Sequence, residues 1–325
     1  MPWRGHPDPY AVWVSEIMLQ QTQVATATPY FERFIQAFPD IPSLASAPVT
    51  KLLKLWEGLG YYTRAHNLQK AAKILLAEHN GKLPATPAEL EKLPGIGPYT
   101  AAAIASICFN HPTPVVDGNV ARVFARYLAW PDDFKTTAAL KKLRDWLTPH
   151  IRSVSTPGDF NQAMMELGSL VCTPTNPACG KCPLSPQCAA FKNNAQQNFP
   201  VKPAAKKPPV RHFAALLLRD EKNRVLLSQR TGERLLPGLW ELPCGECPRP
   251  ATSADAKKLF ASLFKTPAPA FKRGPLITHA FSHFKQSLRV FQAEANGNIR
   301  PPLKWVSDPS TFPLTTTTRR ALAKK

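Results

Sequence analysis

Four cysteines in the second half of the chain have the spacing of a site for a metal ion or an iron–sulfur cluster. They fall within 17 residues in the pattern C-x6-C-x2-C-x5-C: Cys172, Cys179, Cys182 and Cys188. Four thiolates can complete the coordination of a zinc ion or bind the irons of an iron–sulfur cluster. The spacing alone does not distinguish these two kinds of site. Disulfides are the alternative, but they are uncommon in a reducing cytosol.

A second motif has the residue types of an anion-binding turn. Gly95, Ile96 and Gly97 lie in the run Leu93–Thr100, between two stretches that favour helix. Two glycines one residue apart allow a tight turn with exposed amides. At the start of the following helix such amides can bind an anion, for example a DNA phosphate. A plain connection between two helices is the alternative interpretation.

The charge balance favours a polyanionic partner. The 325 residues include 41 Lys and Arg against 22 Asp and Glu, a net charge of +19, which is typical of nucleic-acid-binding proteins. Hydrophobic residues make up 44%, enough for folded cores and too many for a disordered chain. The sequence lacks an apolar run near 18 residues and a secretory leader, so we expect an intracellular protein.

Helices must position both motifs, and strands follow them. Asp8-Pro9 is a helix start, and no Gly or Pro interrupts Tyr10–Val24. The apolar spacing predicts a helix over 63–79, Thr86 begins a capping box, and an apolar helix is expected over Pro98–Phe109. A basic, Pro-rich stretch then reads as a linker. Strands are predicted at 213–218, 224–228 and 287–291, so the tail is expected to be α+β.

Together these features resemble the MutY-type adenine DNA glycosylases, a branch of the helix-hairpin-helix superfamily of endonuclease III. The match follows family order over nearly the whole chain. The matching segments are Trp13–Thr22, Gly58–Tyr62, Pro94–Thr100, Val116–Val120, the cysteine loop and Phe281–His283. Members usually carry about one more helix ahead of the position of Trp3, so a truncated start is one interpretation of this sequence.

The resemblance implies a multidomain architecture. It predicts all-α helix-hairpin-helix domains: a six-helix domain over 1–130 and a cluster domain over 131–190. A basic linker over 191–211 and an α+β, Nudix-like domain over 212–325 follow. It also decides between the metal alternatives in favour of a 4Fe-4S cluster on Cys172, Cys179, Cys182 and Cys188.

The resemblance also assigns the chemistry of base removal. Releasing adenine requires protonating the departing base and stabilising a cation-like sugar, so one carboxyl must be protonated and another ionised. By analogy Glu16 protonates the adenine, and its apolar helical setting is expected to raise its pKa. Asp117 stays ionised and stabilises the sugar cation, while Asn119 and Tyr99 orient the two acids. Taken singly, Glu16 would be a solvated helix residue and Asp117 a helix cap.

Tyr99 separates two reaction types. In the bifunctional glycosylase/lyases the corresponding residue is a lysine whose amine attacks the sugar, and a tyrosine cannot form that Schiff base. We therefore expect a monofunctional N-glycosyl hydrolase that leaves an abasic site. Two alternatives stay open: an endonuclease III-type lyase and a non-catalytic iron–sulfur protein that binds DNA.

Base removal requires the adenine to leave the duplex. By resemblance, Gln21 and Tyr61 wedge into the base stack, and Trp3, Arg4 and Leu19 line the adenine pocket. For Tyr61 and Leu19 the alternative is ordinary core packing.

The tail resembles a Nudix fold at Leu239–Pro243. The next 20 residues offer only Glu246 and Asp255 as acids, too few to hold the metals of a Nudix hydrolase, so we expect a binding module. In the family this domain recognises 8-oxoguanine, and the matching residues are Phe281, Ser282 and His283. The serine hydroxyl can donate and accept, as the lesion requires. A pair of further cysteines, Cys244 and Cys247, is interpreted as structural or free.

The sequence thus predicts a DNA repair enzyme that excises adenine opposite 8-oxoguanine, and less well opposite guanine. Its partner is double-stranded DNA, with no membrane involved. We expect a bacterial-type, cytoplasmic monomer associated with the nucleoid.

Overall fold

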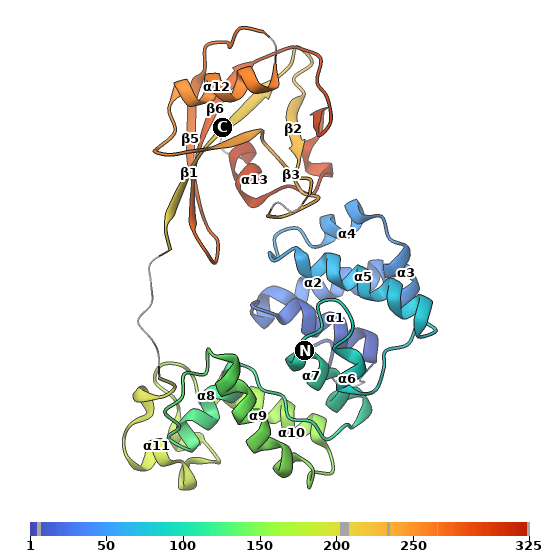
Figure 1. Ribbon diagram of the computed structural model, residues 1–325, viewed down its shortest axis with the longest axis vertical. Helices are drawn as coiled ribbons and strands as arrows, with labels where there is room; N and C mark the ends of the chain where they lie inside the picture. The colour runs from blue at the N-terminus through green and yellow to red at the C-terminus, as the bar shows by residue number, and fades with distance from the viewer. Residues whose placement is uncertain (5–7, 202–207, 233–234, 265, 324–325) are drawn as a thin grey trace. The chain divides into compact units, whose positions relative to one another are not determined.

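The computed structural model describes residues 1–4, 8–201, 208–232, 235–264 and 266–323 (Figure 1). The chain divides into two compact units. One contains Met1–Ser46 and Asn67–Ala205, and the other contains Ala47–His66 and Lys206–Lys325. Residues 202–207 of the expected linker lie outside the described residues.

The first unit is helical. Its α-helices are α1 (Pro9–Leu19), α2 (Val24–Ala37), α3 (Ile41–Ser46), most of α5 (Thr63–Glu78), α6 (Pro87–Leu90), α7 (Pro98–Phe109), α8 (Gly118–Tyr127), α9 (Thr137–Ile151), α10 (Pro157–Glu166) and α11 (Ala189–Lys192). Short turns of other helix types are η1 (Leu167–Val171, a π-helix), η2 (Cys179–Lys181), η3 (Ser185–Gln187) and η4 (Gln196–Asn198). None of the described helices is long and apolar enough to cross a membrane.

Local signals in the sequence set several of these helix ends. The Asp8 carboxylate accepts hydrogen bonds from the amides of Tyr10 and Ala11 and starts α1, as predicted. Thr86 caps α6. The uninterrupted segment Tyr10–Val24 is not a single helix, however, because α1 ends at Leu19. A turn closed by the Thr22 amide on the Leu19 carbonyl interrupts it.

The core of this unit is built around α7, which packs against α1 and α10. Residues Ala101–Ala105 of α7 are buried, and their small side chains let the neighbouring helices approach closely. Trp13 on α1 is also fully buried. α1 therefore lies in the apolar interior of the unit. A polar side chain on the buried face of α1 is consequently buried as well.

The second unit contains a seven-stranded sheet. Its strands are β1 (Val210–Arg219), β2 (Val225–Gln229), β3 (Trp240–Glu241), β4 (Cys244–Cys247), β5 (Lys272–Ala280), β6 (Lys285–Glu294) and β7 (Leu303–Val306). The order is β3-β2-β1-β6-β5, with β4 on β1 and β7 on β2. β1 and β6 are parallel, whereas β5 and β6 form an antiparallel hairpin. The unit also includes α4 (Val49–Leu55), α12 (Ser253–Leu263), η5 (Pro309–Thr311) and α13 (Thr316–Ala323).

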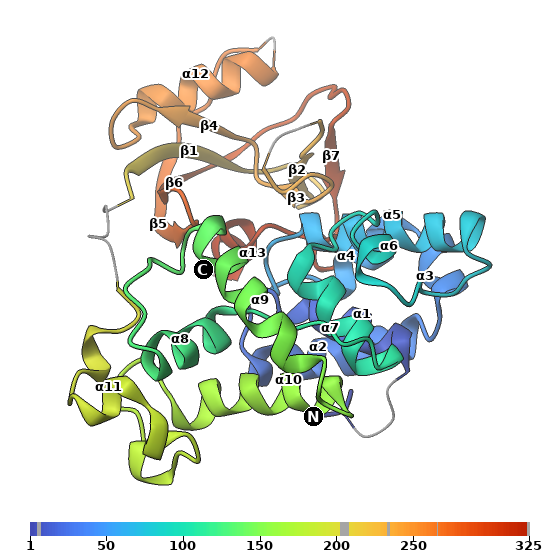
Figure 2. The ribbon, with the colours of Figure 1, turned by 60° about the horizontal axis from the view of Figure 1, so that its bottom comes forward.

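Both faces of this sheet are covered, as Figure 2 shows. Alternate residues of β1 point to opposite faces. Ala214, Leu216 and Leu218 pack with Phe260 of α12, whereas Ala215 and Leu217 pack with Ala321 of α13. The expected α+β tail is therefore observed.

Candidate active site

Glu16 is a buried acid at the centre of the helical unit. It lies on α1 with only 6% of its surface exposed, and the hydroxyl of Tyr99, at the start of α7, donates to its Oε2 at 2.9 Å. Burial raises the pKa of Glu16 to about 7, although the Tyr99 hydrogen bond and the charge of Arg4 oppose the shift. A carboxyl with a pKa near neutrality can serve as a general acid.

Asp117 caps α8 and faces the same region. Its carboxylate accepts from the Val120 amide at 2.7 Å and from the Asn119 side-chain amide at 2.8 Å. The charge of Asp117 contributes to the raised pKa of Glu16, so the two acids lie within electrostatic reach of each other. Asp117 is thus both the cap of α8 and the carboxylate predicted to stabilise the sugar cation. One of its oxygens accepts from the helix amide of Val120 and the other accepts from Asn119.

Arg122, which the sequence analysis did not select, fixes Asn119 from the far side. Its guanidinium donates to the Asn119 side-chain oxygen at 2.8 Å, to the Gly168 carbonyl at 2.7 Å and to the Cys172 carbonyl at 2.8 Å. A Cβ on Gly168 would lie 2.6 Å from the Cβ of Asn119, so only glycine permits η1 to approach this closely. The only sequence signal for Arg122 is its i+3 spacing from Asn119 on a helix.

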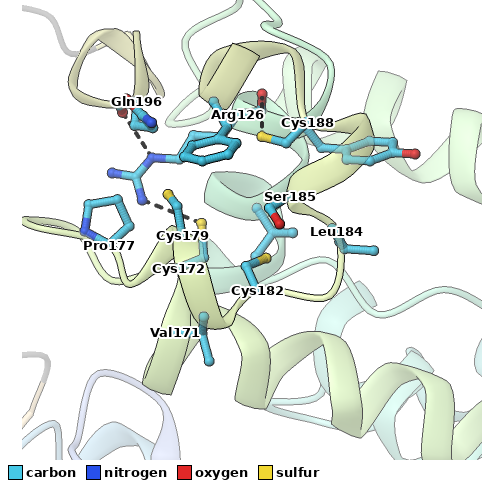
Figure 3. A pocket seen from close by; sticks show the side chains of 13 residues that line it. Arg126, Val171, Cys172, Pro177, Cys179, Cys182, Leu184, Ser185, Cys188 and Gln196 are labelled. Carbon is cyan, nitrogen blue, oxygen red and sulfur yellow. Dashed lines mark hydrogen bonds between the residues drawn. The ribbon is translucent and has the colours of Figure 1, made fainter. Parts of the chain in front are cut away.

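The four predicted cysteines line a single cavity (Figure 3). No disulfide joins any of the chain's seven cysteines. Val123, Val171 and Leu184 add apolar walls. Within the described ranges, no group of three or more His, Cys, Asp or Glu side chains stands ready to hold a metal ion. The four thiols nevertheless line the same cavity, and the segment that carries them contains η2 and η3 and leads directly into α11.

Arg126 is a second arginine that the sequence did not indicate, and it anchors the cysteine loop by hydrogen bonds (Figure 3). It is 2% exposed and lies on α8, one turn after Arg122. Its guanidinium is 3.3 Å from the Cys172 sulfur and donates to the Thr173 and Pro174 carbonyls. It also donates to the carbonyls of Gln196 and Phe199. One buried cation thereby joins both ends of the cysteine loop to α8.

The residues predicted for the adenine pocket are only partly brought together. Trp3 is 7% exposed and packs edge-on against Phe31 at 5.0 Å. Arg4 forms an ion pair with Glu166 at 3.2 Å. Both line a cavity with residues of α7 and α10, and Leu19 is not among its lining residues. Arg4 lies close enough to Glu16 to act on its pKa.

The two predicted wedge residues share an unusual backbone conformation. Gln21 has φ +56° and Tyr61 has φ +48°, the left-handed region that side chains other than Asn and Asp rarely adopt. Gln21 is exposed in the turn after α1, while the neighbouring Gln20 side chain donates to Thr100 at 3.2 Å. Tyr61 is 44% exposed. Strained residues of this kind concentrate at functional sites.

The hairpin of the first unit has the predicted tight turn. Gly95 has φ +81° and is exposed, as is Gly97, the N-cap residue that precedes α7. Ile96 is buried, and its amide donates to the Leu93 carbonyl at 3.2 Å. Because the Ile96 amide donates within the turn, the candidates for binding an anion are the amides of Gly95 and Gly97.

Phe281, Ser282 and His283 form the connection between β5 and β6. The Phe281 amide donates to the Phe284 carbonyl at 2.9 Å, and the two rings stack at 4.8 Å. This leaves Ser282 and His283 exposed at the tip. A cavity of the same unit is lined by these three residues and by Tyr61.

The two acids after the Nudix-like segment have structural partners. Glu246 pairs with Arg211, and Asp255 completes the capping box of α12 with Thr252. Cys244 and Cys247 lie on β4, one in the core on the α13 face and the other in the core on the α12 face.

Comparison with known proteins identifies relatives of both parts. The HhH-GPD superfamily of base excision DNA repair proteins matches residues 14–149, and the NUDIX domain matches residues 214–324. The adenine DNA glycosylase of Homo sapiens is 35% identical, with 94% of this chain and 67% of the relative covered. The adenine DNA glycosylase of Buchnera aphidicola (Schizaphis graminum) is 43% identical, with 75% and 70% covered. A solved thermostable thymine-DNA glycosylase is similar to this chain with TM-score 0.54 and 26% identity, over 59% of this chain and 88% of that one.

Proposed function

Because this chain belongs to the adenine DNA glycosylases, enzymes of base excision repair, we propose that its preferred substrate is adenine opposite 8-oxoguanine in double-stranded DNA. Adenine opposite guanine is the second substrate. The product is an abasic site, and the strand stays uncut.

The pairing of Glu16 with Asp117 carries the proposed mechanism. Glu16 is protonated in a substantial fraction of molecules at neutral pH and delivers its proton to the departing adenine. Asp117 supplies the negative charge that stabilises the cation-like sugar. Its geometry supports this role, because Asn119 and the α8 amide fix its two oxygens. Tyr99 orients Glu16 through its hydroxyl.

Tyr99 also supports base release without strand cleavage. A lyase needs an amine that attacks the sugar, and the residue beside Glu16 is a phenol whose hydroxyl is hydrogen-bonded to that acid. The reaction therefore ends when the base leaves and water adds to the sugar.

Recognition of the lesion is assigned to the β5–β6 connection. Stacked Phe281 and Phe284 support the exposed tip that carries Ser282 and His283. The Ser282 hydroxyl is suited to 8-oxoguanine, which differs from guanine by an N7–H donor and an O8 acceptor. Tyr61, from the same compact unit, lines a cavity with this tip and would insert beside the lesion; Gln21 has the same role from the turn after α1. The glycine amides of the hairpin would bind a backbone phosphate.

The cysteine loop is proposed to hold a 4Fe-4S cluster. The donor set fits, because four thiols and apolar walls enclose one cavity, and Arg126 supplies a positive charge 3.3 Å from the Cys172 sulfur. When bound, the cluster would supply a cross-link within the loop. Arg126 would neutralise thiolate charge and anchor the loop on α8.

The remaining proposals concern organisation. We assign residues 1–130 and 131–190 to the hairpin and cluster domains, 191–211 to a linker, and 212–325 to lesion recognition. The protein would act as a monomer on cytoplasmic, nucleoid DNA.

A cleavage assay tests the proposed function. Duplexes with adenine opposite 8-oxoguanine, guanine or thymine are incubated with the protein and analysed with and without hot alkali. Strand breaks only after alkali, fastest opposite 8-oxoguanine, are expected. Breaks without alkali would indicate a lyase, and no abasic sites would indicate a binding protein. Glu16→Gln should abolish base release and keep duplex binding, whereas Glu32→Gln, at an exposed acid on α2, should leave both base release and duplex binding unchanged.

A further inference from the structure

The segment that carries Tyr61 has an unfavourable backbone. Gly58, Gly60 and Tyr61 have φ angles of +101°, +79° and +48°. Glycine tolerates such angles, whereas a tyrosine adopts them only at a cost in conformational energy. Its ring is nevertheless 44% exposed, so burial of the ring does not account for the conformation. Some other contact must hold this segment in place.

Arg64, in the first turn of α5, makes that contact. Only 8% of its surface is exposed. Its guanidinium donates to the carbonyl of Gly60 at 3.1 Å, and to those of Leu59 and Tyr61 at 3.4 Å each. Three consecutive carbonyls thus converge on one cation.

Aromatic rings complete the surroundings of this cation. The Arg64 Cζ lies 5.4 Å from the ring centroid of Trp56 and 5.5 Å from that of Tyr61, within the range of a cation–π interaction. Trp56 also donates from Nε1 to the Gly60 carbonyl at 3.0 Å. Arg64 therefore contacts both the backbone of Tyr61 and its ring.

The planar guanidinium suits this arrangement better than an ammonium group. Its donors lie in a fixed fork and can reach several carbonyls while its faces stay available to rings. A lysine is a point charge and would satisfy only part of this set. The segment's conformation is consequently coupled to the shape of the Arg64 side chain as well as to its charge.

We propose that Arg64 is a positioning residue that holds the Leu59–Tyr61 backbone in place, with Gly60 and Tyr61 at positive φ, and so presents the Tyr61 ring to the DNA base stack. The second half of this statement rests on the proposed wedge role of Tyr61. The first half concerns the protein alone and is tested without DNA.

The first test observes Tyr61 in the DNA-free protein. The six tyrosines are labelled as 3-fluorotyrosine, and Tyr61→Phe identifies the Tyr61 signal in the fluorine NMR spectrum. Arg64→Lys should shift or broaden this signal and leave the others in place. Arg33→Lys is the matched control, because Arg33 lies 4.8 Å from the ring centroid of Tyr30 but is exposed. An unchanged Tyr61 signal in Arg64→Lys would overturn the proposal.

If Arg64→Lys does not fold by circular dichroism, Gly60→Ala replaces it. A Cβ at Gly60 meets nothing within 4 Å, but the φ of +79° strains any side chain there. This variant disturbs the segment while Arg64 stays intact. The Tyr61 signal should again move, and a fixed signal would show that the ring does not depend on the segment's backbone, against the proposal.

The second test measures base release under single turnover. Arg64→Lys should slow it roughly tenfold, and the same change in a Tyr61→Ala background should cost nothing more. An equal loss in both backgrounds would show that Arg64 does not act through Tyr61. Full activity of Tyr61→Ala, together with a shifted fluorine signal in Arg64→Lys, would refute the wedge role of Tyr61. The proposal that Arg64 holds the Leu59–Tyr61 backbone would then still be supported.

Discussion

Arg122 donates to the side-chain oxygen of Asn119 at 2.8 Å, and the amide of Asn119 donates in turn to Asp117 at the same distance. The orientation of Asn119 is therefore set, since its oxygen accepts from one residue and its nitrogen donates to the other. The same guanidinium reaches the carbonyls of Gly168 and Cys172. Asp117 is thus supported through hydrogen bonds by the chain that leads into the cysteine loop.

Arg122→Lys should slow base release. A lysine cannot reach Asn119, Gly168 and Cys172 together, and small displacements of catalytic groups are costly. We expect a rate loss of about tenfold to a hundredfold under single turnover, with duplex affinity changed much less. Arg152→Lys, an exposed arginine after α9, is the control. An unchanged rate would show that Asn119 needs no support from Arg122.

Base release should depend on pH through Glu16. The acid acts in its protonated form, and its pKa is about 7, so the rate should be level below pH 7 and fall roughly tenfold per unit above it. Tyr99 donates a hydrogen bond that lowers this pKa, so Tyr99→Phe should move the alkaline limb to higher pH. Tyr127→Phe, which removes an exposed hydroxyl bonded to Gln187, should not. A limb that stays in place in Tyr99→Phe would contradict the assignment of Glu16.

The same acid should make the fold less stable at alkaline pH. The folded pKa of about 7 lies above the ordinary 4.5, so the stability that protonated Glu16 supplies is complete below pH 4.5 and lost as the pH rises to about 7. Glu16→Gln does not titrate and should exceed the parent at pH 8 by at most about 3 kcal/mol. Apparent Tm values at pH 5 and 8 measure this, with Glu32→Gln as control. A difference independent of pH would argue against a raised pKa.

The tip of the β5–β6 connection should set the preference for the lesion. Ser282→Ala together with His283→Ala removes hydrogen-bonding groups without touching the stacked phenylalanines beneath. We expect the ratio of rates opposite 8-oxoguanine and guanine to fall roughly tenfold, the value of one or two hydrogen bonds. Ser262→Ala, an exposed serine on α12, should leave the ratio intact. If the double variant also leaves this ratio of rates unchanged, Ser282 and His283 do not distinguish 8-oxoguanine from guanine.

The cysteine loop should carry a chromophore. The purified protein should absorb broadly in the visible, as iron–sulfur clusters do and zinc sites do not. Cys182→Ser should reduce this band and lower the apparent Tm, because the loop loses one of its anchors. Cys244→Ser, in the sheet domain, should keep the band. Loss of the band in both variants, or in neither, would count against the proposed ligands.

Local chemistry made much of this fold predictable. Pro98 and the apolar run after it define α7 from Pro98 to Phe109 as expected, and the capping side chains of Asp8 and Thr86 start helices where predicted. These signals act within a few residues. The end of α1 at Leu19 had no such signal, because Gln21 occupies a left-handed position that usually selects glycine.

The family resemblance predicted that Asn119 and Tyr99 orient the two acids, without saying which residue contacts which acid. In the structure Tyr99 donates to Glu16 and Asn119 donates to Asp117. The arginines that support the site were not anticipated. Arg122 and Arg126 contact residues 46 to 73 positions away, and composition or periodicity does not specify such partners. From sequence alone, an arginine on an amphipathic helix is predicted to be exposed to solvent. Only the structure shows which segment covers it.

Cys244 and Cys247 stand three residues apart on β4 and enter separate cores. Along an extended strand this spacing is about 10 Å between Cα atoms, well beyond the reach of a disulfide. Peroxide or other oxidants therefore cannot lock the two thiols together. Each of the two thiols would have to react singly, so oxidation could not cross-link β4 at this pair.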